Sequence, residues 1–285
     1  MRVLVITHHF WPENFKINDF VDGLIDRSHE LTILTGKPNY PKGYIYPKFK
    51  KNPKDFKKYR SAEILRVPII PRGSSRIQLF LNYLSFLFSL SIFGTFMIRK
   101  KKFDRIIVFA VSPISVAIPA IIISKLKNIP VFLWVLDLWP DTLTAVGFKS
   151  KALLRLVHNM VNFVYRRSAM ILVPSNGAVK KIKNDFKLSS KVIFFPGWAE
   201  ELFNDDKAGS SVIPLNNDFF NIVFTGNLGE AQDFSSLIKV AKKCKHTNNL
   251  KWHIVGDGRM KSWIENEILE NSLEDTIYTY GNFDI

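Results

Sequence analysis

Residues 2–36 read RVLVITHHFWPENFKINDFVDGLIDRSHELTILTG, and they contain an apolar run, a helical pattern and a second apolar run. The two runs, Arg2–His8 and Glu30–Thr35, are short and mostly apolar, which is typical of strands covered on both faces of a parallel sheet. Between them, Asn14–Arg27 carries apolar residues at helical spacing. A strand, a helix and a second strand predict the first βαβ unit of an α/β fold.

The same alternation continues along the chain. Further strands are expected at Ile64–Ile70, Arg105–Ala110, Val131–Asp137, Met170–Pro174 and Val192–Phe195, and further helices at Pro113–Leu126, with Ser112 as its N-cap, and Lys151–Arg167. Residues 201–215 are rich in Asp, Gly, Ser and Pro and predict a linker. We therefore expect a doubly wound parallel-sheet domain over 1–200 and a second α/β domain over 216–285.

The second domain begins in the same way as the first. Its predicted strands and helices are Asn221–Phe224, Ser235–Cys244, Lys251–Val255, Lys261–Leu269 and Ile277–Tyr280. About 70 residues follow the linker, fewer than the roughly 100–150 of an ordinary domain. No helix follows to cover the last strand, so we expect an incomplete second domain, in a chain that is a fragment or a shortened relative of a longer protein.

The composition fits a folded protein with a basic surface. Of 285 residues, 47% are hydrophobic and 23% charged, and the net charge is +15. A single cysteine, Cys244, excludes a disulfide within the chain and a cysteine-based zinc cluster. Lys37–Arg60 contains nine basic residues and one acid, a patch that attracts nucleic acid, anionic lipid or a phosphorylated substrate. A solubilising surface with no specific partner is the alternative; no nucleic-acid-binding motif is present.

The segment Leu79–Ile98 has the length of a membrane span. It contains Asn, Ser, Gly and Thr and has basic residues on both sides, which disfavours a simple crossing. We therefore expect a helix that stays on one side of the membrane and dips its outer face, with Phe80, Leu84 and Phe88, into the cytoplasmic leaflet. The alternative is a helix buried against the sheet.

Polar residues collect where the predicted strands end, which is where open parallel sheets bind ligands. Asp137 follows an apolar strand and is well placed to act as a base or to orient a hydroxyl, although it could instead cap the next turn. His8 and His9 follow the first strand and suit a phosphate or sugar, or local packing. Glycines at 226 and 229 suit a phosphate near a helix N-terminus or a simple tight turn. No dinucleotide fingerprint or P-loop occurs.

Several strings together resemble the family-4 glycosyltransferases. Residues 27–36, RSHELTILTG, and residues 254–258, IVGDG, resemble stretches of the whole family. A narrower WbuB/WcaI-like branch, whose members assemble O-antigen, capsule and colanic acid, is resembled by HFWPEN at 9–14, KPNYPKG at 37–43, DLWP at 137–140 and GNLGEAQ at 226–232. The resemblance covers the whole chain and implies the GT-B fold, with two Rossmann-like domains and a cleft between them.

The resemblance also implies an activity and its partners. It implies a retaining transfer, without a metal or other cofactor, of an N-acetylamino sugar from a UDP-sugar to an undecaprenyl-diphosphate-linked acceptor in bacterial surface polysaccharide synthesis. Such an enzyme would be cytoplasmic and peripheral on the anionic inner face of the plasma membrane, with no nucleic-acid partner.

The same resemblance implies roles for individual residues. Asp137 would orient acceptor or sugar hydroxyls, with Asp141 and His9 as lesser catalytic candidates. The remaining assignments are pyrophosphate contacts at Gly226, Asn227, Gly229 and Gln232, base contacts at Gly281, Asn282 and Phe283, and acceptor- or lipid-facing positions at Trp11, Asn14, Lys37 and Lys42.

A non-catalytic alternative remains open. The paired glutamates with which the family holds the donor ribose and sugar are expected beyond Ile285. The chain could therefore be a membrane-associated binding subunit or a remnant of such an enzyme.

Overall fold

A computed structural model describes residues 1–73, 75–145, 147–188, 190–199, 213–247 and 249–283. The chain divides into two compact units, Met1–Thr144 with Phe148–Asn204 and Asp205–Ile285 with Ala145–Gly147. Most of the expected linker, 201–215, lies outside the described residues.

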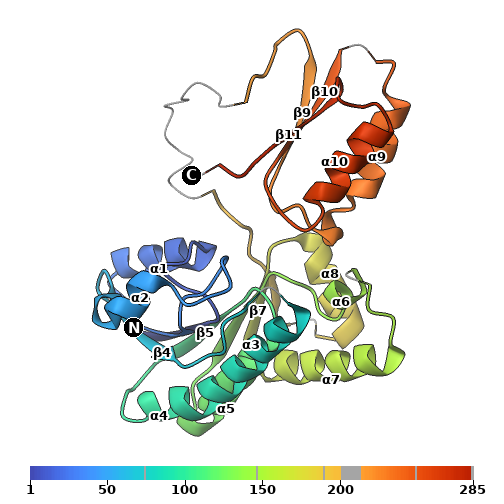
Figure 1. Cartoon of the computed structure of the whole chain (residues 1–285). Coiled ribbons are helices and arrows are strands. Elements are labelled where there is room, and N and C mark those ends of the chain that lie inside the picture. Colours follow the sequence, from blue (N-terminus) through green and yellow to red (C-terminus); the bar gives the residue numbers. More distant parts are fainter. Residues whose placement is uncertain (74, 146, 189, 200–212, 248, 284–285) are drawn as a thin grey trace. The chain divides into compact units, whose positions relative to one another are not determined.

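The first unit is built on an eight-stranded sheet with the order β3-β4-β2-β1-β5-β6-β7-β8 (Figure 1). Its strands are β1 Arg2–Thr7, β2 Glu30–Gly36, β3 Lys58–Tyr59, β4 Ala62–Val67, β5 Arg105–Ala110, β6 Val131–Val135, β7 Met170–Val173 and β8 Val192–Phe194. All neighbours are parallel except β3 and β4. Central strands such as β1, whose residues Val3–Thr7 are all buried, have both faces covered, which explains their continuous apolar runs.

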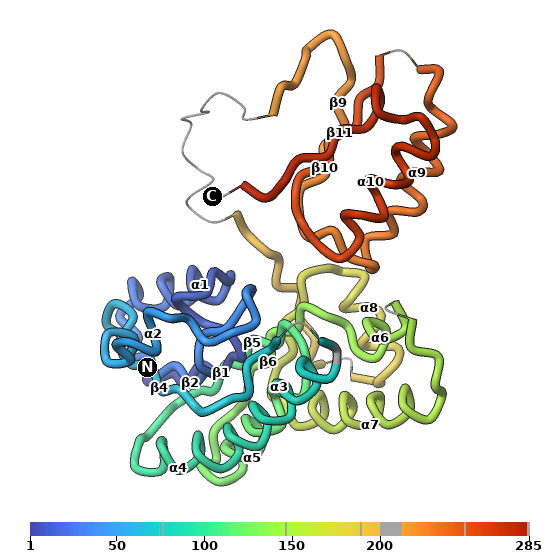
Figure 2. Tube along the Cα trace, in the orientation of Figure 1, coloured from blue at the N-terminus to red at the C-terminus, as the bar shows by residue number. Residues whose placement is uncertain are grey.

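Helices cover the two faces of this sheet unequally (Figure 2). They are α1 Lys16–Asp26, α2 Pro47–Lys51, α3 Arg76–Ser89, α4 Thr95–Met97, α5 Ala117–Lys127, α6 Asp141–Ala145, α7 Lys151–Arg167 and α8 Asn176–Phe186, with 3-10 turns at Pro53–Phe56 and Ile114–Val116. Helix α1 packs on one face through Ile17 and Val21. The larger core on the other face contains buried residues of α3, α5, α7 and α8.

Most of the predicted elements are confirmed to within a few residues. The structure adds the two-residue strand β3 and the helices α2, α6 and α8, which were not predicted. The expected helix at Pro113–Leu126 begins instead with the 3-10 turn Ile114–Val116, and Ser112 is not its N-cap. The Ser112 hydroxyl donates a hydrogen bond to Asp137.

The long apolar segment of the first unit is one helical rod. Helix α3 continues through a π-helical turn, Leu90–Gly94, into α4. Its part Ile77–Met97 has the length and composition of a membrane span, and only 22% of its apolar window is buried. The strands before and after it, β4 and β5, belong to the same sheet, so the chain returns to the side from which it came.

The second unit begins a second parallel sheet with the order β11-β10-β9. Its strands are β9 Phe220–Thr225, β10 Leu250–Val255 and β11 Ile277–Tyr280, and its helices are α9 Phe234–Lys243 and α10 Lys261–Glu270. The core between sheet and helices is formed by residues such as Phe234, Ile254 and Ile264.

Candidate functional site

The carboxyl edge of the first sheet brings together side chains from five strand ends. His8 and His9 follow β1, Tyr40 follows β2, and Arg72 follows β4, while Ser112 and Asp137 follow β5 and β6. Because these five strands are consecutive neighbours in the sheet, their parallel ends meet along one edge.

Glu13 organises two of these loops. Its buried carboxylate accepts hydrogen bonds from the backbone N–H groups of Asn39 at 2.8 Å, Tyr40 at 2.7 Å and Phe10 at 3.2 Å. It also pairs with Nδ1 of His9 at 3.1 Å. A buried carboxylate needs several such partners, and here they tie the loop after β1 to the loop after β2.

The two histidines after β1 are buried and stacked at this edge. The His8 ring stacks on His9 at 4.5 Å and on Phe86 of α3 at 4.3 Å, while His9 stacks on Phe15 at 5.0 Å. Neither ring nitrogen of His8 has a hydrogen-bond partner among the described residues. Burial, with help from the charges of His9 and Arg72, holds the pKa of His8 well below its ordinary value. His8 is therefore a neutral ring near pH 7, and His9, a lesser catalytic candidate, is buried and paired with Glu13.

Arg72 provides an available positive charge at this edge. Its backbone N–H donates to Oδ1 of Asn39 at 2.9 Å, and its guanidinium carbon lies 5.1 Å from the centre of the Tyr40 ring. In the part of the chain that the structure describes, the guanidinium has no ion pair and no hydrogen bond. A guanidinium stacked on an aromatic ring keeps its N–H groups for a planar anion such as phosphate.

Asp137 provides the opposite charge. It is partly buried at the end of β6, and burial raises the pKa of its carboxyl group, although the hydrogen bond from Ser112 lowers it in part. Burial also raises the pKa of Tyr83 on α3; the charge of Arg72 opposes that rise, and Asp137 and Tyr40 add to it. The hydroxyl of Tyr83 thus lies within the fields of both Arg72 and Asp137. A carboxylate and a guanidinium on one edge can hold a hydroxyl and a phosphate of one substrate.

The other first-unit candidates lie elsewhere or contact protein. Asp141, in the first turn of α6, is exposed and forms an ion pair with Nζ of Lys181 at 3.0 Å. The Trp11 ring packs near Phe56 and Tyr59 at 5.3 and 5.8 Å. Asn14 and Lys42 are exposed, and Lys37 is partly buried.

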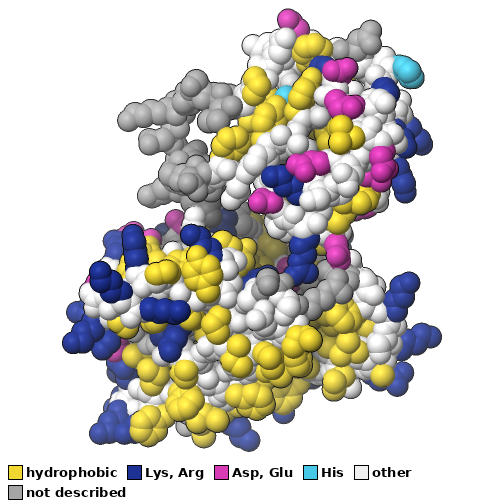
Figure 3. All heavy atoms as spheres, viewed as in Figure 1, with side chains coloured by type: hydrophobic (Ala, Val, Ile, Leu, Met, Phe, Trp, Pro, Cys, Tyr) yellow, Lys and Arg dark blue, Asp and Glu magenta, His cyan; other side chains and the backbone are white. Residues whose placement is uncertain are grey.

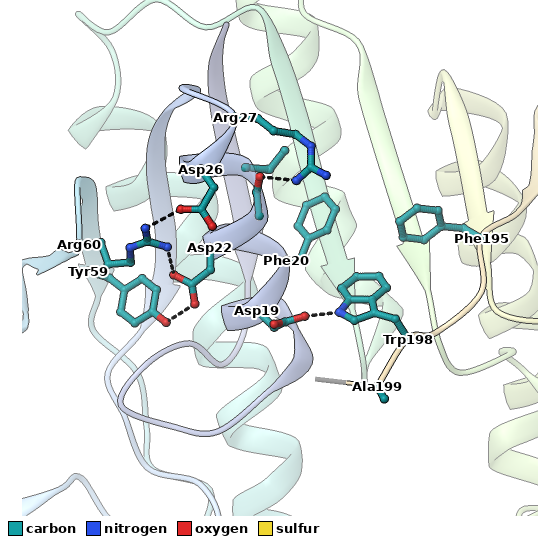
Figure 4. A pocket seen from close by; sticks show the side chains of 12 residues that line it. Asp19, Phe20, Asp22, Asp26, Arg27, Tyr59, Arg60, Phe195, Trp198 and Ala199 are labelled. Atoms are coloured by element: carbon teal, nitrogen blue, oxygen red, sulfur yellow. Dashed lines mark hydrogen bonds and ion pairs between the residues drawn. The ribbon is translucent and has the colours of Figure 1, made fainter. Parts of the chain in front are cut away.

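A pocket of about 760 Å³ opens on the α1 side of the same unit (Figure 4). Its carboxylates already have partners: Asp22 accepts from the Tyr59 hydroxyl at 2.7 Å, and Asp22 and Asp26 both bind Arg60. Asp19 accepts a hydrogen bond from the indole of Trp198. None of the predicted site residues lines this pocket, and its polar groups join α1 to Tyr59 and Arg60 and to the chain after β8.

The glycines of the second unit serve a close contact between two loops. A Cβ on Gly256 would lie 1.9 Å from the carbonyl oxygen of Gly226, and one on Gly258 would lie 2.3 Å from that of Leu228. The N–H of Gly226 donates to Val255 at 3.0 Å and that of Leu228 donates to Asp257 at 2.9 Å. These groups hold the loops after β9 and β10 together, a role that the glycine pattern did not reveal.

The remaining donor candidates also bond to one another. The N–H of Gly229 donates to the carbonyl oxygen of Asn227 at 3.0 Å and to Oε1 of Gln232 at 3.2 Å. The carboxylate of Asp233 caps the N-terminus of α9 through the Ser236 N–H. A pyrophosphate at Gly229 would replace the Gln232 oxygen. Asn227, Gly281, Asn282 and Phe283 are exposed, and nothing lies within 4 Å of a Cβ built on Gly281.

Comparison with solved structures identifies the architecture. No protein-family model and no curated protein matches this sequence. The structure of the Anabaena protein HepE in complex with UDP is similar to this chain, with 13% sequence identity and a TM-score of 0.61; the match covers 99% of this chain and 70% of HepE. WaaG, a glycosyltransferase involved in lipopolysaccharide biosynthesis, matches 100% over 70%, with 11% identity and a TM-score of 0.57. The chain has the GT-B fold.

The GT-B fold also carries other reactions on nucleotide sugars. UDP-N-acetylglucosamine 2-epimerase from Rickettsia bellii matches 98% of this chain over 68% of its own, with 14% identity and a TM-score of 0.54. At such identities the likeness concerns the fold, so the reaction must be argued from the site. Among the described residues, no three His, Cys, Asp or Glu side chains are grouped so that they could hold a metal ion.

Three residues of the first-unit edge were not predicted. Arg72 comes directly after the stretch 68–71, which begins and ends with proline and follows a strand. Prolines at the end of a strand usually indicate a loop. Glu13 was noted only as part of a motif, and its burial depends on backbone N–H groups of the loop after β2, which lies far from it in the sequence. Tyr83 carries no local signal, because its role depends on the packing of α3 beside β1.

Proposed function

We propose that the chain is a retaining glycosyltransferase that moves an N-acetylamino sugar from a UDP-sugar to an undecaprenyl-diphosphate-linked acceptor in bacterial surface polysaccharide synthesis. The observation that carries the proposal is the position of a carboxylate, Asp137, and a guanidinium, Arg72, after strands that end at the same carboxyl edge of a GT-B first sheet. The UDP bound to HepE, which shares this fold, supports a nucleotide sugar as the donor. The motif resemblance supports the finer choice of sugar and acceptor.

On the acceptor side, each charge has one task. Asp137, held by Ser112, accepts a hydrogen bond from an acceptor or sugar hydroxyl and orients it toward the anomeric carbon. Arg72 binds the diphosphate of the acceptor through its planar N–H groups. Burial raises the pKa of Tyr83, so its hydroxyl stays protonated and donates a hydrogen bond to either substrate.

On the donor side, the loop Gly226–Gln232 receives the pyrophosphate. The Gln232 side chain occupies the Gly229 N–H in the present structure, and it moves aside when the phosphate oxygen takes its place. Gly281, Asn282 and Phe283 are exposed after β11 and available to the base. No metal or other cofactor takes part in this proposal.

The test is a transfer assay with a radiolabelled UDP-N-acetylamino sugar, run with and without lipid-linked acceptor extracted from membranes. Labelled lipid that forms only when acceptor is present supports the proposal. Conversion of the UDP-sugar to its epimer without acceptor contradicts it in favour of an epimerase. Binding of acceptor lipid with neither reaction contradicts it in favour of the non-catalytic subunit.

A further inference from the structure

The face of the first unit formed by α3, α4, α5 and α7 exposes an unusual number of large apolar side chains (Figure 3). Helix α5 contacts both the α3–α4 rod and α7, so the helices form one layer. The exposed apolar residues of this layer are Ile77, Phe80, Leu81, Phe88, Ile92, Phe93, Phe96, Met97, Ile122, Leu126, Leu156 and Phe163. Contiguous apolar surface of this kind marks a place where another apolar phase or molecule binds.

The charged residues of this layer are basic, which favours an anionic partner. Its helices, with the π-helical turn, contain no Asp or Glu. Their cations include Lys125, Lys127, Arg155, Arg166 and Arg167, and Lys100 and Lys102 follow α4. Two arginines stack on exposed rings of the same face, Arg99 on Phe96 at 3.7 Å and Arg167 on Phe163 at 3.9 Å. Apolar and aromatic residues with basic and no acidic neighbours are complementary to the interface of an anionic bilayer.

We propose that α3, α4, α5 and α7 together form a docking face that inserts into an anionic lipid surface. The face is wider than the single helix expected from the sequence, and it rests on the proposed function only for its purpose. Helix α3 belongs both to the candidate site and to the docking face. On the side of the site, Phe86 stacks on His8 and the Tyr83 ring lies edge-on to His8 at 5.7 Å. On the docking face, Phe80 and Phe88 are about 60% exposed. Docking through α3 would therefore bring the bilayer surface toward Arg72, where the proposed function places the diphosphate of a lipid-linked acceptor.

Three leucines of similar exposure allow a matched test. Leu126 on α5 and Leu156 on α7 are each 67% exposed, and Leu269 on α10 of the second unit is 62% exposed. The full chain and its Leu126→Gln, Leu156→Gln and Leu269→Gln variants are floated with phosphatidylglycerol-containing vesicles and with pure phosphatidylcholine vesicles. We expect binding to the anionic vesicles, weakened by high salt. The α5 and α7 variants should bind about tenfold more weakly, and the α10 variant should bind like the parent.

The opposite results overturn the proposal. Absence of flotation at low salt contradicts a lipid partner, and equal binding by all three variants contradicts the contribution of α5 and α7. Light scattering of the same proteins identifies the competing occupant: a dimer that Leu156→Gln abolishes would assign the face to a second copy of the chain. Flotation needs no sugar, so a chain that docks without transferring contradicts only the proposed function. Transfer to a soluble acceptor analogue without flotation contradicts only the docking face.

Discussion

The carboxyl edge of the first sheet is formed mainly by side chains, and that of the second sheet mainly by backbone groups. In the first unit, charged and aromatic side chains converge: the charges of Asp137 and Arg72 both act on Tyr83, and Glu13 fixes the loops. In the second unit, glycines let two backbone loops touch, and several N–H groups already donate to neighbouring carbonyl oxygens. The comparison predicts that Asp137 and Arg72 at the first edge can be substituted with the fold retained, whereas substitution of Gly256 at the second edge disturbs the fold.

The largest expected effect comes from the charge at the end of β6. Asp137→Asn keeps an oxygen for the Ser112 hydroxyl but removes the negative charge, and we expect the rate of sugar transfer to fall about 100-fold or more. Asp141→Asn is the matched control, because Asp141 is exposed and paired with Lys181. Turnover near the parent value for Asp137→Asn would remove this residue from the mechanism, and an equal loss in both variants would show that the two acids share the role.

The second prediction concerns the stability of the second edge. In Gly256→Ala the new Cβ would collide with the Gly226 carbonyl oxygen, at a backbone angle φ of 141° that L side chains rarely adopt. We expect the free energy of unfolding to drop by about 2 kcal/mol or more, as measured by denaturant titration. Gly281→Ala, with open space around its Cβ, should change it by less than about 0.5 kcal/mol. Equal stability of both variants would contradict the close loop contact.

The third prediction concerns recognition of the acceptor. Arg72→Gln should raise the KM for a diphosphate-linked acceptor about tenfold with little change in kcat, because the lost interaction is made equally in the ground and transition states. Arg105→Gln is the control at the opposite, amino edge of the sheet, where β5 begins. A fall in kcat with an unchanged KM would assign Arg72 to the reacting centre instead.

The sequence predicted the parts of the fold that depend on local burial. Strands such as β1 and β5 are covered on both faces, so their composition alone marks them, and the rod over α3 and α4 is long and apolar. Strand β3 has two residues and no such pattern. Helix α8 could have been predicted, because Ser175 is a good N-cap and the buried residues Ala178, Ile182 and Phe186 occur at every fourth position, which is helical spacing.

The candidate site divides in the same way. Asp137 was found because it ends an apolar run, but Arg72 and Tyr83 come to the same edge only through the order of strands in the sheet and the packing of α3. That order is not a local property of the sequence. The glycines at 226 and 229 were interpreted as a phosphate loop or a tight turn, whereas the structure shows that Gly256 and Gly258 accommodate the carbonyl groups of Gly226 and Leu228 in that loop. A glycine pattern does not say whether the closely approaching group is a ligand or the chain itself.

The smallest expected effect tests whether the first edge tolerates change, as the comparison requires. The pKa of His8 is lowered in the folded chain by burial and by His9 and Arg72, whereas in the unfolded chain it is about 6.5. Below that pH the unfolded state binds a proton that the folded state excludes. Stability should therefore fall as the pH drops below about 6.5, by up to about 1.4 kcal/mol per pH unit for this group.

His8→Phe isolates that contribution, because an uncharged ring can keep the stacking on His9 and Phe86 and the two buried nitrogens have no partners to lose. Thermal melts between pH 7 and pH 5 should show a shallower loss of Tm for His8→Phe than for the parent. His246→Phe, an exchange at an exposed position of the second unit, should leave the slope unchanged. Identical slopes for parent and His8→Phe would mean that His8 takes up its proton in the folded state. His8 would then be a titrating group of the site, within the field of Arg72, and not a neutral packing residue.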